Sequence, residues 1–100
     1  MYTIIYKFNI KSNTRDAFIN AWKEMTLLIK EHEGGLGSRL HIEDQNTFIA
    51  YAQWSDKETF EKSGNNLPQE ASDIRSRMRS SCISVERLME MAVVEDMLVK

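Results

Sequence analysis

Two alternating stretches joined by a short polar connection place the strongest constraint on the fold. Residues 36–43 and 47–54 alternate in the way that is typical of half-buried β-strands. The intervening EDQN consists of turn-forming residues, and so short a connection predicts an antiparallel hairpin. The second strand is predicted to carry Phe48, Ala50, Ala52 and Trp54 on one face and Ile49, Tyr51 and Gln53 on the other.

The chain begins with a predicted strand followed by a helix. YTIIYKFNI is rich in β-branched and aromatic residues, which favour strands. Residues 14–33 have the period of an amphipathic helix, and Asn13 is predicted to be its N-cap. The strand presents Ile4, Tyr6, Phe8 and Ile10 on one face and Thr3, Ile5, Lys7 and Asn9 on the other. The helical stripe comprises Phe18, Trp22, Met25, Ile29 and His32, widened by Ala17, Ala21 and Leu28, and we interpret it as core.

The remaining segments complete a recognisable order of elements. SDKE is predicted to be a capping box in which Ser55 and Glu58 begin a second helix. SGNNLP interrupts that helix, and Pro68 is predicted in the first turn of the resumed helix. A fourth strand is predicted from residue 83 to about residue 91. The order β-α-β-β-α-β predicts a single ferredoxin-like α+β domain over residues 1–100, with an antiparallel sheet and both helices on one face.

Composition argues against several classes of protein. The 13 basic and 15 acidic residues leave no basic excess, so we expect no nucleic-acid partner. No apolar run approaches the roughly 20 residues that span a bilayer, and the first residues do not resemble a signal peptide, so we expect a cytoplasmic protein without a membrane partner. Cys82 is interpreted as a structural residue. His32 and His41 lack the spacing of a ligand set, so we expect no metal site.

The predicted sheet is apolar on both faces. Ile5, Ile49 and Tyr51 point away from the predicted helices. Such a sheet needs a second cover, and a partner subunit that packs sheet on sheet is the simplest one. We therefore expect a homodimer, to which the C-terminal AVVEDMLV contributes.

The hairpin and its surroundings resemble the antibiotic biosynthesis monooxygenase family over nearly the whole chain. The similarity includes GSRLH, FIAYAQWSDKETFEKS and the hydrophobic C-terminal strand, and its most telling part is Trp54 followed by a capped helix that carries Phe60. The resemblance implies a dimeric α+β barrel with a pocket between helices and sheet. It also implies a cofactor-independent monooxygenase acting on a small aromatic, phenolic or quinol substrate. The haem-degrading branch of the family needs a later histidine, and none follows His41.

The candidate site residues follow from this resemblance and from the strand faces. The resemblance implies that Trp54 supplies ring contacts and an indole N–H donor, while the small Ala50 and Ala52 leave space above the sheet. Two alternatives stay open: Trp54 as a plug of the core, and the polar candidates turned toward the dimer interface. The predicted catalytic residues are Trp54, Tyr51, His41 and Arg39, and the predicted substrate-binding residues are Trp54, Phe48, Tyr6 and Met25. We expect no cofactor, and the competing function is a non-catalytic dimeric barrel that binds a small hydrophobic metabolite.

Overall fold

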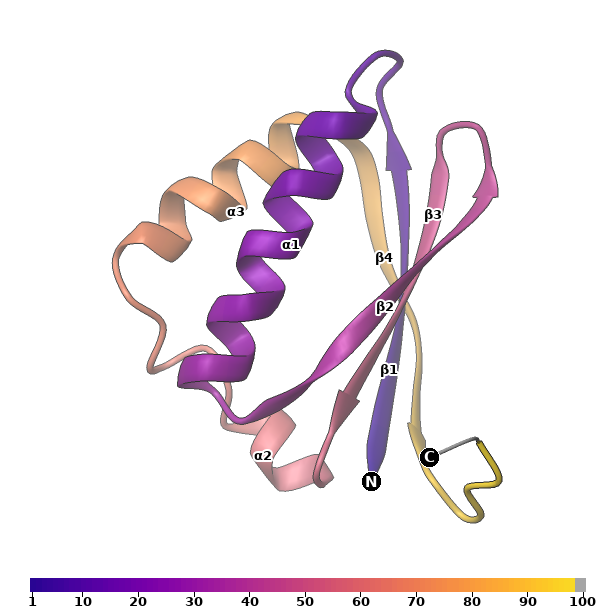
Figure 1. Cartoon of the computed structure of the whole chain (residues 1–100), viewed down its shortest axis with the longest axis vertical. Helices are drawn as coiled ribbons and strands as arrows, with labels where there is room; N and C mark the ends of the chain where they lie inside the picture. Colours follow the sequence, from indigo (N-terminus) through magenta and orange to yellow (C-terminus); the bar gives the residue numbers. More distant parts are fainter. Residues whose placement is uncertain (99–100) are drawn as a thin grey trace.

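The computed structural model describes residues 1–98 and contains the predicted elements in the predicted order. These elements are β1 (Tyr2–Ile10), α1 (Arg15–His32), β2 (Gly35–Asp44), β3 (Thr47–Trp54), α2 (Lys57–Glu61), α3 (Glu70–Ser80) and β4 (Cys82–Ala92). The strands form one antiparallel sheet in the order β2-β3-β1-β4. The long helices α1 and α3 cover one face of it (Figure 1). The predicted ferredoxin-like α+β fold is confirmed.

The strand register decides which side chains share a face of the sheet. β1 pairs with β3 so that Ile4 lies opposite Ala52 and Tyr6 lies opposite Ala50, all on the helix-covered face. The same pairing puts Ile5 opposite Tyr51 on the outer face. Ile4, Phe8, Ile10, Phe48, Ala50 and Trp54 are all buried, as the alternation predicted.

The buried face of α1 is rotated relative to the predicted stripe. Phe18, Ala21, Met25 and Leu28 are buried on α1. Ala21, Met25 and Leu28 pack with Ala71 and Ile74 of α3. Because α3 lies along α1, the buried face turns partly toward α3, and the predicted stripe residues Ala17 and His32 are exposed.

The first predicted N-cap is displaced by one residue. Asn13 has a φ of 64°, in the left-handed region that asparagine tolerates, so it makes the turn before the helix. Thr14 is the N-cap, and its hydroxyl donates to the Lys11 carbonyl at 2.7 Å. Pro68, predicted in the first turn of the resumed helix, lies just before the N-cap residue Gln69 of α3. The predicted N-cap at Asn13 and the predicted place of Pro68 in the first turn of the helix were therefore wrong.

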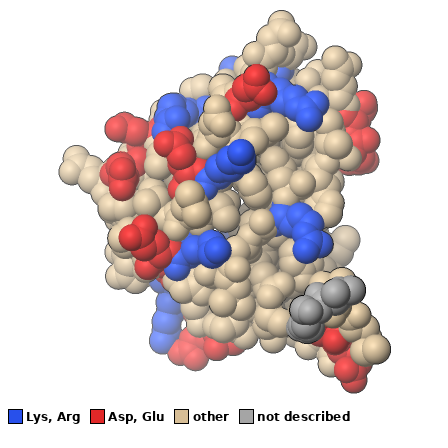
Figure 2. Space-filling model, in the orientation of Figure 1, with Lys and Arg blue, Asp and Glu red and all other residues tan. Residues whose placement is uncertain are grey.

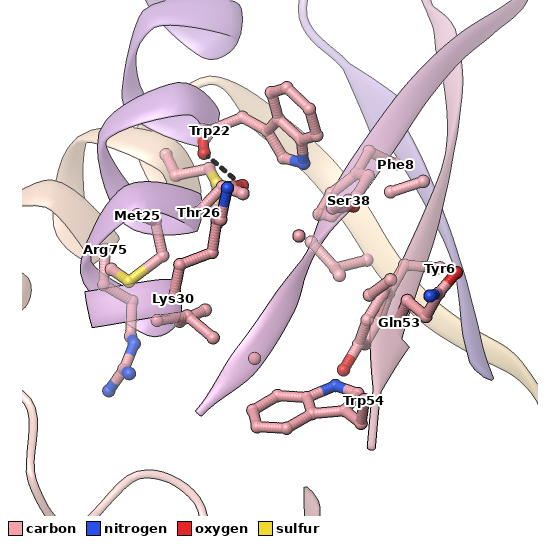
Figure 3. A pocket seen from close by; sticks show the side chains of 17 residues that line it. Tyr6, Phe8, Trp22, Met25, Thr26, Lys30, Ser38, Gln53, Trp54 and Arg75 are labelled. Carbon is pink, nitrogen blue, oxygen red and sulfur yellow. Dashed lines mark hydrogen bonds between the residues drawn. The ribbon is translucent and has the colours of Figure 1, made fainter. Parts of the chain in front are cut away.

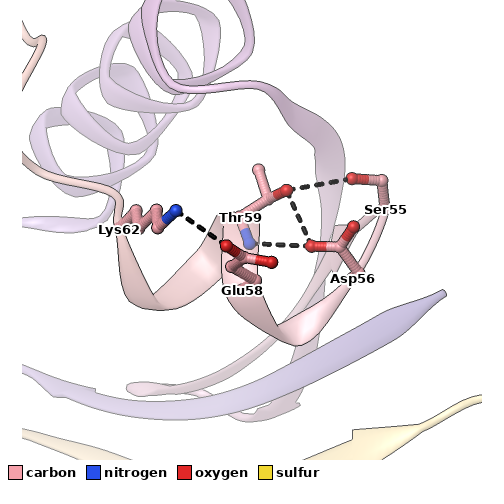
Figure 4. Close-up of polar contacts among 5 residues, drawn as sticks. All are labelled: Ser55, Asp56, Glu58, Thr59 and Lys62. Carbon is pink, nitrogen blue, oxygen red and sulfur yellow. Dashed lines mark hydrogen bonds and ion pairs between the residues drawn. The ribbon is translucent and has the colours of Figure 1, made fainter.

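The predicted capping box after Trp54 is also replaced by another arrangement. Asp56 is the N-cap of α2, and its carboxylate accepts from the Thr59 backbone N–H and the Thr59 hydroxyl, both at 2.7 Å (Figure 4). Ser55 instead donates to the Thr59 hydroxyl at 3.3 Å, and Glu58 pairs with Lys62 at 2.7 Å. A charged carboxylate is a stronger acceptor than a serine hydroxyl, which accounts for the shift of the cap.

β4 begins one residue earlier than predicted, at Cys82. This side chain is half-buried and packs against the core cluster of Phe8 and Phe18. Burial raises the pKa of the Cys82 thiol, and the charge of Lys11 only partly opposes that shift. A thiol with a raised pKa is a weak nucleophile, which supports the predicted structural role.

Within residues 1–98, no helix has the length and apolar character required to cross a membrane.

We expect the Asp56 cap to make stability depend on pH. Hydrogen bonds from the Thr59 backbone and side chain lower the pKa of Asp56 below its ordinary value. A lowered native pKa contributes stability that is complete above the unfolded-state pKa and is lost as the pH falls through the native one. Asp56→Ala should therefore unfold at lower urea concentration than the wild type at pH 7, and the gap should close on acidification.

The control for this cap is Ser55→Ala, which removes a neutral hydrogen bond from the same turn. Its midpoint should differ from the wild type by an amount that does not change with pH. A gap between Asp56→Ala and the wild type that stays constant down to pH 2 would contradict the assigned role of the carboxylate.

Candidate ligand-binding site

A cavity of about 260 Å³ lies between α1 and the helix-covered face of the sheet (Figure 3). Ala50 and Ala52 of β3 line it from the sheet, while Met25 and Ile29 of α1 line it from the helix. Ser38 of β2 lines it on the side of the sheet edge. The two alanines occupy adjacent inward positions of a central strand, where larger side chains would fill this space. The cavity therefore lies above Ala50 and Ala52, where the sequence predicted an open space.

Aromatic side chains hold α1 away from the sheet at both ends of this cavity. At one end, Phe18 of α1 is fully buried, with its ring centroid 5.1 Å from that of Phe8 and 5.4 Å from that of Phe48. At the other end, Ile29 of α1 packs against the cluster that contains Trp54 and Ile4, and Phe60 of α2 lies edge-on to the Trp54 ring at 5.5 Å. The small residues of β3 lie between these supports, so the gap is a consequence of the packing at its two ends.

Trp54 both closes the core and lines the cavity. Its side chain is 5% exposed and belongs to a cluster with Tyr2 and Ile4. Gly35 is required beside it, because a Cβ there would come within 2.7 Å of Ile29 Cγ2 and 3.6 Å of the Trp54 ring. The close approach of β2 to α1 thus fixes the ring at the end of the cavity.

Tyr6 brings a hydroxyl group to the same end of the cavity. Burial raises the pKa of Tyr6, while the charge of Arg87 and a hydrogen bond from it act in the opposite direction. A nearby guanidinium attracts the lone pairs of the Tyr6 oxygen and not its proton, so the phenolic proton remains available. Figure 3 shows the Tyr6 hydroxyl beside the indole nitrogen of Trp54, so two donors serve one part of the cavity.

Arg87 is itself held by a small polar network on β4. Arg87 Nη1 donates to Glu90 Oε2 at 3.2 Å, and the Tyr2 hydroxyl donates to Glu90 Oε1 at 2.9 Å. The hydrogen bonds from Tyr2 and Arg87 lower the pKa of Glu90, so this carboxylate stays ionised. The guanidinium also lies 5.2 Å from the ring centroid of Phe60. These contacts orient the Arg87 guanidinium, whose charge acts on the Tyr6 hydroxyl.

Three of the four predicted substrate-binding residues line the cavity. These are Tyr6, Met25 and Trp54. Phe48 does not line it but packs behind Phe8 and Phe18 as part of the supporting cluster.

The other three predicted catalytic residues lie on the outer face of the sheet. In the register, Arg39 is opposite Tyr51 and His41 is opposite Ile49. The Tyr51 hydroxyl accepts from Thr3 Oγ1 and donates to Gln53 Oε1, both at 3.3 Å. The structure therefore does not bring Arg39, His41 or Tyr51 to the cavity, because strand alternation turns them to the opposite side.

Several lining residues were not singled out by the sequence. Trp22, Thr26 and Lys30 are four residues apart on α1 and face β2, whereas Arg75 reaches the cavity from α3. Trp22 is half-buried, although the periodicity assigned it to the core. The spacing of four residues is visible in the sequence. Because Thr26 and Lys30 are polar, the hydrophobic periodicity did not identify these three residues as one face of the helix.

Side chains that could act as general bases or metal ligands do not gather at this cavity. Its lining includes no aspartate, glutamate or histidine. Over residues 1–98, no group of three or more His, Cys, Asp or Glu side chains is placed to hold a metal ion. The polar groups at the cavity are mainly hydrogen-bond donors.

The fold and cavity define this chain as a ferredoxin-like α+β protein with a ligand-sized space between helices and sheet. The family model described as antibiotic biosynthesis monooxygenase matches residues 1–71, and the chain belongs to this family. A search of curated protein sequences finds no significant match.

Solved structures share the fold at low sequence identity. One is SnoaB, a cofactor-independent oxygenase from Streptomyces nogalater, with 12% identity, coverage of 96% of this chain and 95% of that chain, and a TM-score of 0.77. Another is a protein from Chloroflexus aurantiacus J-10-fl that is assigned as an antibiotic biosynthesis monooxygenase. It has 18% identity, coverage of 99% of this chain and 98% of that chain, and a TM-score of 0.78. Rv0793 from Mycobacterium tuberculosis has 11% identity, coverage of 97% and 98%, and a TM-score of 0.73. These likenesses establish the fold.

Two substitutions at Trp54 should separate its structural contribution from its contribution to binding. Trp54→Ala removes a buried ring and should lower the free energy of unfolding by about 3–5 kcal/mol, measured by urea denaturation. Trp54→Phe should retain the fold but weaken the binding of aromatic ligands, because the phenyl ring is smaller than the indole ring and has no N–H donor. If Trp54→Ala changed neither stability nor the binding of any aromatic ligand tested, both assignments would be wrong.

Proposed function

We propose that this protein is a cofactor-independent monooxygenase whose substrate is a phenol or quinol of about two fused rings, bound in the cavity beneath α1. The size of the cavity supports this substrate class, because an apolar cavity of about 150 Å³ holds benzene and this one measures about 260 Å³. The lining supports it as well, since it is largely apolar and contains the rings of Trp22 and Trp54. Membership of the monooxygenase family supports the type of reaction.

The proposed reaction needs only the substrate and dioxygen. The substrate loses a proton to water, and its anion passes one electron to dioxygen. The resulting radical and superoxide combine to form a carbon–oxygen bond, which gives a peroxide after protonation. In its keto tautomer the phenol has a ring CH₂ carbon, written R₂CH₂, and the peroxide formed there is R₂CH–OOH. Loss of water from this peroxide leaves a carbonyl, so that R₂CH₂ and O₂ yield R₂C=O and H₂O.

The residues of the cavity would favour the anion that starts this sequence. The Tyr6 hydroxyl and the Trp54 indole N–H are donors for the developing oxyanion at one end of a largely apolar cavity. Since the raised pKa of Tyr6 keeps it protonated at neutral pH, it acts as a donor and not as a base. The proton would go to water, because no carboxylate or imidazole lines the cavity.

Oxygen uptake with a panel of naphthols and naphthoquinols tests this reaction. Tyr6→Phe should lower kcat by roughly 100-fold, as expected when one oxyanion donor is lost. The matched control is Tyr51→Phe, which removes the same hydroxyl from the outer face of the sheet and should retain the wild-type kcat. Equal losses in the two variants, or a loss in Tyr51→Phe alone, would contradict the assignment of Tyr6.

One observation favours a second function, a non-catalytic protein that binds a small hydrophobic metabolite. The cavity lining has no carboxylate or imidazole to act as a general base, so a substrate that is not itself acidic would be bound without reaction. The same panel separates the two functions. Binding by calorimetry with no oxygen uptake from any ligand would favour the binding protein.

We also propose that the protein is a homodimer that packs outer sheet face against outer sheet face. The proposal is supported by the apolar residues of that face, which include Ile5, Ile49 and Tyr51 on β1 and β3. On β4, Met89 and Met91 lie on the same face and are 53% and 39% exposed in the single chain. A stable interface of this kind buries about 1,000 Å² or more in total.

Light scattering at micromolar concentration should give twice the 11.7 kDa mass of the chain. Ile49→Glu places a charge on the outer face and should shift the protein toward the monomer. Leu27→Glu is the matched control, because Leu27 is 63% exposed on α1 and should leave the dimer intact. A monomeric mass for the wild type would reject the dimer.

A further inference from the structure

The cavity carries positive charge that nothing in its lining balances. Lys30 and Arg75 are its charged lining residues, and no aspartate or glutamate accompanies them. Within residues 1–98, neither forms an ion pair, whereas the nearby Arg77 pairs with Glu24 at 2.8 Å. The chain as a whole has a formal charge of −2, and basic and acidic side chains are interspersed over the face shown in Figure 2, so this local positive charge does not reflect a general basic excess.

Lys30 is placed over the side of the cavity that faces β2. Its stem lies over Gly37, where a Cβ would be 3.8 Å from Lys30 Cδ, and the Gly37 φ of 116° favours glycine there. Figure 3 shows the Lys30 side chain extending along α1 toward Thr26, with Ser38 across from it and Trp22 beyond. Lys30 is thus an exposed residue at the edge of the cavity, and within residues 1–98 its ammonium group has no acidic partner.

The two polar regions of the cavity lie at different ends. The Tyr6 hydroxyl and the Trp54 indole nitrogen lie together at one end, and the Lys30 ammonium lies at the other, near Trp22 (Figure 3). The lining between them is mostly apolar, with the alanines of β3 on the sheet side. A ligand that satisfies both ends is a flat ring system with a hydroxyl group at one end and an anion at the other.

We infer that the substrate is an aromatic carboxylate, whose hydroxyl group lies at Tyr6 and Trp54 and whose carboxylate is bound by Lys30 and the Ser38 hydroxyl. Arg75 adds positive potential from the side of α3. The inference rests on the proposed function for the location and the aromatic character of the ligand. It goes further by assigning a permanent negative charge to the substrate and the recognition of that charge to Lys30.

Calorimetric titration of the intact protein with two ligands tests this inference. 6-Hydroxy-2-naphthoate and 6-hydroxy-2-naphthamide have the same rings and hydroxyl group and differ in one negative charge. The naphthoate should bind the wild type at least about tenfold more tightly at low salt, which is the usual gain from a hydrogen bond to a charged group. Lys30→Met keeps most of the stem and should abolish this preference by weakening the naphthoate alone.

Lys23→Met is the matched control, because Lys23 is an exposed lysine of α1 that does not line the cavity. It should leave the affinity for both ligands unchanged. The inference is overturned if the wild type binds the naphthamide as tightly as the naphthoate, if it binds neither at millimolar concentration, or if Lys30→Met weakens both equally. Loss of the preference in Lys23→Met as well would also overturn it. A charge preference lost in Lys30→Met without oxygen uptake from any substrate would reject the monooxygenase and retain the carboxylate site.

Discussion

The distance between α1 and the sheet is the constraint on which the rest of the structure depends. Phe18 packs on Phe8 and Phe48 at one end of the helix, and Ile29 packs on the cluster that contains Trp54 at the other. Aromatic rings are large and stiff, so they set this distance firmly. β3 then places alanine where larger residues would fill the layer. A chain of 100 residues has only a modest core, so leaving this space empty costs stability that a bound ligand would restore.

The alternation of side chains gives the two faces of the sheet different surroundings. On the covered face, Tyr6 and the alanines of β3 contribute to a cavity shielded by α1. On the outer face, Arg39, His41 and Tyr51 lie beside Ile5 and Ile49, the apolar residues on which the proposed dimer rests. A shift of one residue in register would exchange the two sets, because the period of a strand is two. The short turn between β2 and β3 helps to prevent such a shift.

The polar chemistry of the cavity depends on contacts between distant parts of the chain. Tyr6 is supported by Arg87, and Arg87 by Glu90, which the Tyr2 hydroxyl also binds. These contacts exist because β4 pairs with β1 at the edge of the sheet. The opposite end depends on the approach of α1 to β2, where the stem of Lys30 lies over Gly37. Two different pairings of elements thus supply the donor end and the cationic end of one cavity.

The sequence by itself determined the strands, the helices, their order and the faces of β1 and β3, because periods of two and 3.6 are local properties of the chain. It also indicated the space above Ala50 and Ala52 and the roles of Tyr6, Met25 and Trp54 in lining it. Cap positions were missed by one residue, since Asn13 and Asp56 compete with neighbours of similar chemistry. Only the tertiary structure decided that Lys30 and Arg75 reach the cavity and that Arg87 supports Tyr6. Those relations depend on how α1, α3 and β4 are placed against the sheet, which long-range packing sets and no local pattern encodes.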